Sequence, residues 1–178
     1  MAKATRDAEP VRSIVLQPAR LQNYKATVEQ GVPLQRVARL LPHEEAGRLR
    51  QVFRQGTAAV WGLMPDATGS AEKRWARLQA GDHVLFSGRG EIIAAGTVAG
   101  KTRSKALATD LWGSDASGRT WELIYFLSEL TPIALPYSDF NAIAGYKARF
   151  CPRTMFFLPE DKARSVLTGL LDRDLMGR

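Results

Sequence analysis

Sulfur and imidazole ligands are scarce in this chain. Its 178 residues include one cysteine, Cys151, and two histidines, His43 and His83. A single thiol excludes an intramolecular disulfide and any zinc site built from several thiolates, and it is typical of a reducing compartment. The two histidines do not form a metal-ligand spacing, and an HNH nuclease would need several. We therefore expect no metal centre and no cofactor, and we interpret Cys151 as a small buried apolar residue.

Long apolar runs are missing as well. The longest of them, such as Ile92 to Ala95, fall far short of the roughly 20 residues that span a bilayer. The polar segment from Met1 to Pro10 lacks the apolar centre of a secretory signal. We therefore expect a cytoplasmic protein with no membrane partner.

The sequence also lacks the usual catalytic signatures. It contains no nucleophile elbow, phosphate-binding loop or dinucleotide fingerprint. The run Gly88-Arg89-Gly90 has no strand–turn–helix context, so we interpret it as a hairpin turn. A small hydrolase that uses Asp110, Asp115 or Glu122 is the enzyme hypothesis, but no second feature supports it, and loop carboxylates usually face solvent. We expect a binding module rather than a self-sufficient enzyme.

What the chain does have is an excess of positive charge. It carries 25 basic and 18 acidic residues, for a formal net charge of +7. Residues 1–60 hold ten basic and five acidic side chains, whereas residues 61–130 hold eight of each. A basic surface favours a polyanionic partner, because neutralised phosphates release their counterions. A solvated basic surface without a partner is the alternative interpretation.

The order of hydrophobic patterns predicts an α+β fold. We interpret residues 1–12 as a disordered leader and 13–178 as one domain. Helices are predicted at 20–31, 34–41, 43–55, 72–78, 138–143 and 159–171. Strands are predicted at 13–16, 58–61, 83–87, 91–101, 121–127 and 131–135, and residues 154–157 are expected to be extended. Without alternating strand–helix units, this order favours a curved antiparallel sheet or small β-barrel flanked by helices.

All four tryptophans fall in the middle of the chain, and they divide into two groups. Trp61 and Trp112 each precede a glycine at the end of an ordered segment, which would leave room for a planar ligand such as a base to stack. Core packing is the alternative for both. We assign Trp121 to the core together with Tyr125 and Phe126. Trp75 is expected to anchor a helix.

Several basic residues are candidates for contacts with phosphates. Lys101, Arg103 and Lys105 alternate, so in an extended segment they would point to the same side. Lys73, Arg74 and Arg89 complete the candidate set of backbone contacts. A solvated strand edge is the alternative.

An ordered series of motifs resembles a known family. It runs from Ala59-Val60-Trp61-Gly62 through Gly81-Asp82-His83-Val84-Leu85-Phe86 and Leu111-Trp112-Gly113 to Thr120-Trp121-Glu122-Leu123-Ile124-Tyr125-Phe126-Leu127. This series, over roughly residues 13–157, is similar to the EVE and YTH-like domains of the PUA-like superfamily. The nearest form is the specificity domain of modification-dependent restriction enzymes. The series as a whole carries the resemblance, rather than any one motif.

The resemblance implies a compact β-barrel with an aromatic pocket for a base flipped out of nucleic acid. By motif position, Trp61 and Trp112 would form the walls. The backbone at Gly62 and Leu63 would read the edge of the modified base, together with the polar groups of Asn23 and Ser87. The helical insertion between Leu34 and Gln55 is longer than in a minimal YTH domain, which puts the reach of Asn23 in doubt.

Two functions follow from the resemblance. The first is a reader of methylated or otherwise modified bases in double-stranded DNA, serving a restriction system. Its nuclease or ATPase effector would be a further domain of a longer enzyme or a separate protein. The alternative is an RNA-binding module that recognises modified RNA, and competition between matched DNA and RNA oligonucleotides separates the two.

Overall fold

The computed structural model describes residues 12–173, so nearly all of the predicted leader lies outside the described residues. Seven strands form one sheet in the order β2-β3-β6-β5-β4-β1-β7. The strands are β1 (Ile14–Pro18), β2 (Val32–Pro33), β3 (Thr57–Leu63), β4 (His83–Gly88), β5 (Glu91–Arg103), β6 (Leu123–Pro136) and β7 (Phe156–Phe157). The helices are α1 (Leu21–Tyr24), the π-helix η1 (Lys25–Glu29), α2 (Leu34–Ala38), α3 (His43–Val52), α4 (Ser70–Arg77), α5 (Lys105–Trp112), α6 (Tyr137–Ala144) and α7 (Glu160–Asp172).

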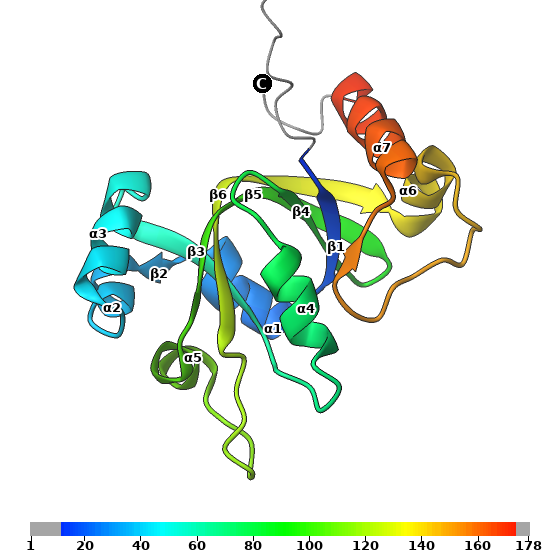
Figure 1. Cartoon of the computed structure of the whole chain (residues 1–178). Coiled ribbons are helices and arrows are strands. Elements are labelled where there is room, and N and C mark those ends of the chain that lie inside the picture. The colour runs from blue at the N-terminus through cyan, green and yellow to red at the C-terminus, as the bar shows by residue number, and fades with distance from the viewer. Residues whose placement is uncertain (1–11, 174–178) are drawn as a thin grey trace, which may run out of the picture.

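The predicted α+β class is confirmed, and the sheet is curved but open. β1 pairs with β4 in parallel, whereas the other neighbouring pairs are antiparallel. The curvature arises in β5 and β6, which pair along most of their length with three register shifts (Figure 1). Such bulges bend a strand and increase its twist. Glu129, at the bend of β6, has a φ of 52°, in the left-handed region.

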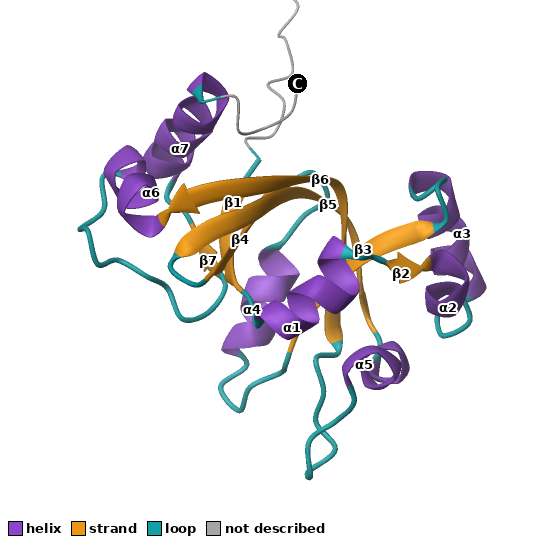
Figure 2. Cartoon of the chain, turned by 180° about the vertical axis from the view of Figure 1, so that it is seen from behind, coloured by secondary structure: helices purple, strands orange, loops and turns teal. Residues whose placement is uncertain are grey.

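Helices cover both faces and both ends of the sheet (Figure 2). Alternation along β4 sends Leu85 into a core beneath α6 and α7, and it sends Val84 and Phe86 into a second core that includes Tyr24 of α1. A third core packs α2, α3 and α5 against the far ends of β3 and β6. α2 and α3 therefore lie at the opposite end of the molecule from α6 and α7 (Figure 1).

Most predicted elements are present, and the differences have local causes. The hairpin of β4 and β5 turns at Arg89, whose φ is 54°. The predicted strand 121–127 begins later, at Leu123, so Trp121 is outside it. The prediction of a buried Cys151 is wrong, because this residue is exposed in the long connection between α6 and β7.

Candidate functional site

A cavity of about 340 Å³ opens where β1, β3, α4 and the end of α5 converge. Its volume lies within the range of about 300–1,000 Å³ that is usual for small-molecule sites. Residues far apart in sequence line it, from Gln17 to Met155. The aromatic lining residues are Trp61, Trp112 and Trp121, and the polar and charged ones are Gln17, Arg20, Asn23, Asp66, Arg74, Arg153 and Thr154. A cavity with aromatic walls and several polar groups suits a planar, hydrogen-bonding ligand.

The three tryptophans occupy different structural positions. Trp61, on β3, is 7% exposed and packs edge-on against Phe86 with ring centroids 5.4 Å apart. Trp112 is the last residue of α5, and Trp121 lies two residues before the start of β6. Their rings meet at 69° with centroids 6.4 Å apart, so they form a corner rather than a parallel pair.

The expectation that Trp121 belongs to the core is wrong. It is half-buried and lines the cavity, because it lies before the first residue of β6 and the alternation of that strand does not apply to it. Trp75 has its predicted anchoring role, since its indole N–H donates to the carbonyl of Ile124 at 3.0 Å. By contrast, the indole nitrogens of Trp61 and Trp112 are buried without a hydrogen-bond partner among the described residues.

Gly62 makes room for the cavity wall, not for a ligand. A Cβ at this position would lie 2.4 Å from the carbonyl oxygen of Trp121 and 2.8 Å from a ring carbon of Trp112. The space beside Trp61 is therefore filled by Trp112 and by the backbone before β6. This corrects the interpretation of the Trp61-Gly62 pair as an opening for a planar ligand. Gly62 and Leu63 both line the cavity, and their contact with a base stays a prediction.

Gln17 is a polar lining residue that the sequence reasoning missed. It is 4% exposed, yet it lines the cavity. Its Oε1 accepts from the hydroxyl of Tyr125 at 3.2 Å, and its Nε2 donates to the carbonyl of Pro18 at 2.8 Å. These two bonds fix the amide and leave one N–H and one oxygen lone pair for a ligand. The signal in the sequence was a glutamine inside the apolar strand Ile14–Pro18.

Of the two predicted polar readers, only one lies at the cavity. Asn23 is in its lining, because the helices between Leu34 and Gln55 pack at the far end of β3 and do not displace α1. Ser87 is outside the lining. Its hydroxyl contacts Tyr137, in the core beneath α6 and α7, because it follows Leu85 by two residues and takes the same face of β4.

Positive charge dominates the charged lining of the cavity. The lining contains three arginines, Arg20, Arg74 and Arg153, and one carboxylate, that of Asp66. A hydrogen bond from the Thr68 hydroxyl, with others from Ser70 and Ala71, holds the pKa of Asp66 well below its usual range. The same bonds commit this carboxylate to the start of α4. Arg74 is 3.9 Å from it, and its buried Nε has no partner among residues 12–173.

The predicted row of Lys101, Arg103 and Lys105 does not form. Lys101 is committed to the end of α4, where its ammonium donates to the carbonyls of Trp75, Ala76 and Leu78 at 3.0, 2.7 and 2.7 Å. Arg103 is ion-paired with Glu122 at 2.6 Å. Lys105 starts α5, so it is not in an extended segment.

The remaining predicted phosphate contacts lie in three different places. Arg74 faces the cavity, and Lys73 is exposed on α4. Arg89 is exposed at the turn between β4 and β5 and is not in the cavity lining. The structure thus brings together at the cavity only one of the six cations predicted from sequence.

Asp110, Asp115 and Glu122 do not form a catalytic pair, and Asp110 lies on α5 and not in a loop. Asp110 is ion-paired with Arg36 at 2.6 Å, and Glu122 is paired with Arg103. Asp115 accepts from the Ser117 hydroxyl and from Arg119, and these bonds lower its pKa to about 2. Over residues 12–173, no group of three or more His, Cys, Asp or Glu side chains is arranged to hold a metal ion. Within the same range, none of the helices is long and apolar enough to cross a membrane.

Comparisons with known proteins find similarity at the level of the fold. No family model matches the chain, and no curated protein sequence matches it. The N-terminal domain of Thermococcus gammatolerans McrB, solved bound to m5C DNA, is similar with a TM-score of 0.65 and 12% sequence identity; the match covers 91% of this chain and 99% of that one. A mutant ASCH protein from Zymomonas mobilis matches with a TM-score of 0.48 and 10% identity, over 88% and 98% of the two chains. The similarity to the McrB domain shows that this chain and that domain share a fold.

Proposed function

We propose that this protein reads modified bases in DNA by holding a flipped base in the tryptophan-lined cavity. The observation that carries the proposal is the convergence of Trp61, Trp112 and Trp121 with the fixed amide of Gln17 in one cavity. Extruding a base costs a few kcal/mol, and stacking on an aromatic face returns about 1–3 kcal/mol. The shared fold with a McrB domain that is bound to m5C DNA supports the same function.

Within this proposal the lining residues have distinct roles. Trp112 and Trp121 form a corner that offers one ring face and one edge to the base, and Trp61 closes the inner wall. Gln17, Asn23 and the backbone of Gly62 and Leu63 contact the edge of the base. Ser87 has no part in it. A nuclease or ATPase effector, in a longer chain or a separate protein, would act on the DNA that this domain selects.

The test measures binding of three cavity variants to duplexes that differ only in one modified base. The duplexes carry 5-methylcytosine, N6-methyladenine or no modification, and fluorescence anisotropy gives the affinities. Trp112→Ala and Trp121→Ala are the informative variants, because both side chains are half-buried. Trp61 is nearly fully buried, and its truncation to alanine would cost about 3–5 kcal/mol of stability, so Trp61→Phe replaces it. Trp75→Phe is the matched control, since Trp75 does not line the cavity.

Removal of one stacking face should weaken binding of the preferred modified duplex by about 5- to 150-fold. Affinity for the unmodified duplex should change little, so selectivity falls. Unchanged affinity and selectivity in both Trp112→Ala and Trp121→Ala would refute the proposal. Matched RNA oligonucleotides are included, and tighter, cavity-dependent binding of modified RNA would replace DNA by RNA as the ligand.

A further inference from the structure

The connection between α6 and β7 is a basic segment beside the cavity. Residues 145–155, here called the α6–β7 loop, contain Lys147, Arg149 and Arg153 and no acidic residue. All three side chains are exposed, and none is ion-paired among the described residues. The charges of this segment are spaced irregularly, so no periodicity or repeat marks them in the sequence.

The α6–β7 loop and α4 border the same cavity. Arg153 lines it from the loop, and Arg74 lines it from α4. α4 also contacts β7, the strand that follows the loop, because the guanidinium of Arg77 lies 4.3 Å from the ring centre of Phe157. Lys73 and Arg77 are four residues apart and share one face of α4. The loop and α4 therefore each carry exposed cations and each supply an arginine to the same cavity.

The loop holds its cations on a fixed backbone. The amide of the fully buried Asn141 donates to the carbonyls of Ala148 at 3.1 Å and Phe150 at 2.9 Å. Tyr146 stacks on Phe150 with centroids 4.0 Å apart, and both rings pack on Phe156. A preorganised surface loses less conformational entropy when it binds a partner.

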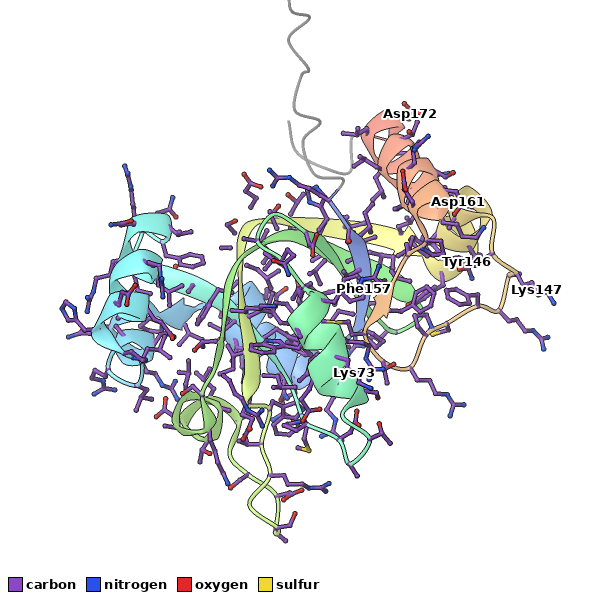
Figure 3. The ribbon with its side chains drawn as sticks, viewed as in Figure 1. Lys73, Tyr146, Lys147, Phe157, Asp161 and Asp172 are labelled. Carbon is purple, nitrogen blue, oxygen red and sulfur yellow. The ribbon has the colours of Figure 1, made fainter. Side chains whose placement is uncertain are left out.

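Two acidic residues near this surface are committed to other contacts. Asp66 is committed to the start of α4, and Glu160 is ion-paired with Arg164. Figure 3 shows Asp161 on α7 near Tyr146 and Asp172 at the far end of that helix, whereas Lys147 projects outward from the loop. Asp66 and Glu160 therefore do not cancel the positive charge on the cavity side, and Asp161 lies at the Tyr146 end of the loop.

We propose that the α6–β7 loop and the exposed face of α4 bind the phosphate backbone of double-stranded DNA on either side of the flipped nucleotide. This proposal rests on the proposed function, since it places the backbone where the base would enter the cavity. The residues assigned to contacts with DNA phosphates are Lys147, Arg149, Arg153, Lys73 and Arg77. The end of β5 is not assigned such contacts, because Lys101 and Arg103 already have partners within the protein.

The salt dependence of binding tests the assignment. On an unmodified duplex, the logarithm of the binding constant falls with the logarithm of salt concentration with a slope of about −0.9 for each phosphate contact. The loop variant combines Lys147→Gln, Arg149→Gln and Arg153→Gln. The matched control combines Arg48→Gln, Arg50→Gln and Arg54→Gln, which removes the same charge from exposed positions in and just after α3, at the opposite end of the molecule (Figure 1). Exposed substitutions of this kind should leave both variants folded.

The loop variant should reduce the magnitude of the slope by as much as about 3, and the control should leave it unchanged. Equal slopes for the loop variant and wild type, or equal reductions in the two variants, would overturn the proposal. Stronger loop-dependent binding to double-stranded RNA than to DNA would overturn the choice of DNA.

The two proposals fail in different ways. A second loop variant, limited to Lys147→Gln and Arg149→Gln, leaves the cavity-lining Arg153 in place. It should keep the ratio of affinities for modified and unmodified duplexes, because phosphate contacts carry no base information. Trp112→Ala should lose that ratio and keep the salt slope. A wild-type protein that shows the loop-dependent slope without any preference for a modified base refutes the reading function alone.

Discussion

Replacement of Gly62 by alanine tests how the cavity wall is built. The added Cβ would lie 2.4 Å from the Trp121 carbonyl oxygen and 2.8 Å from Trp112, and real Cβ atoms essentially never come within 3.0 Å of another heavy atom. The carbonyl belongs to the backbone, so rotation of a side chain cannot relieve this contact. Either β3 or the segment before β6 must therefore move. That movement disturbs the sheet, because Gly62 pairs with Ile124.

Overpacking of this kind costs about 1–3 kcal/mol. For a domain of this size, each kcal/mol lowers the melting temperature by about 2–4 °C, so Gly62→Ala should melt roughly 2–12 °C below wild type. Binding of a modified duplex should also weaken, because the displaced Trp112 and Trp121 no longer form their corner.

The assay is thermal unfolding followed by circular dichroism, with Gly100→Ala as the control. Gly100 lies on β5 of the same sheet, and a Cβ there would meet no atom within 4 Å. Its variant should melt close to wild type. The double variant Gly62→Ala with Trp112→Leu should recover part of the lost stability, since it removes the contact with the ring but not the one with the carbonyl. If Gly62→Ala melts like wild type and binds normally, the wall is not packed as described.

Four further substitutions separate structural from ligand-binding roles. Gln17→Leu should reduce selectivity among modified duplexes by about fivefold, which corresponds to the loss of one hydrogen bond of about 1 kcal/mol. Tyr125→Phe should act in the same direction, because it removes the hydroxyl that holds the Gln17 amide. Full selectivity in both variants would exclude Gln17 as a reader. Lys101→Met should lower the melting temperature by a few degrees, because it removes the partner of three carbonyls at the end of α4. It should leave the salt slope of DNA binding unchanged. A reduced slope would show that Lys101 is a phosphate contact after all. Asp66→Asn should destabilise the protein at pH 7, and the difference should shrink in acid. The folded-state pKa of Asp66 lies below its unfolded value, so its contribution is present above about pH 4 and is lost as pH falls through the folded-state pKa. A difference in melting temperature that does not vary with pH would contradict this role.

Local patterns were sufficient for most of the secondary structure and for one wall of the cavity. The hairpin of β4 and β5 was predictable because its turn residues and apolar alternation act over a few residues. Trp61 was found because it ends a short apolar run and precedes a glycine. The family resemblance implied Asn23 and Leu63 as contacts of the base, and both line the cavity.

The errors concern interactions between distant segments. Lys101 was expected to face a ligand, but α4 ends beside it and supplies three carbonyls. Ser87 was placed at the cavity, although the alternation of β4 and the packing of Tyr137 put it on the other face. The α6–β7 loop was overlooked because only the pairing of β7 with β1 brings it to the cavity.

The sequence by itself determined most of the segments that become helices and strands, although not α5, because propensity, periodicity and turn chemistry are local. It also determined that the chain is basic and carries its tryptophans together. Only the tertiary structure decided which side chains meet. The parallel pairing of β1 with β4 and the bend in β5 and β6 bring distant segments together around one cavity. Its lining residues lie up to 138 positions apart in the sequence, from Gln17 to Met155. Those contacts also decided which cations have internal partners and which remain exposed beside the tryptophans.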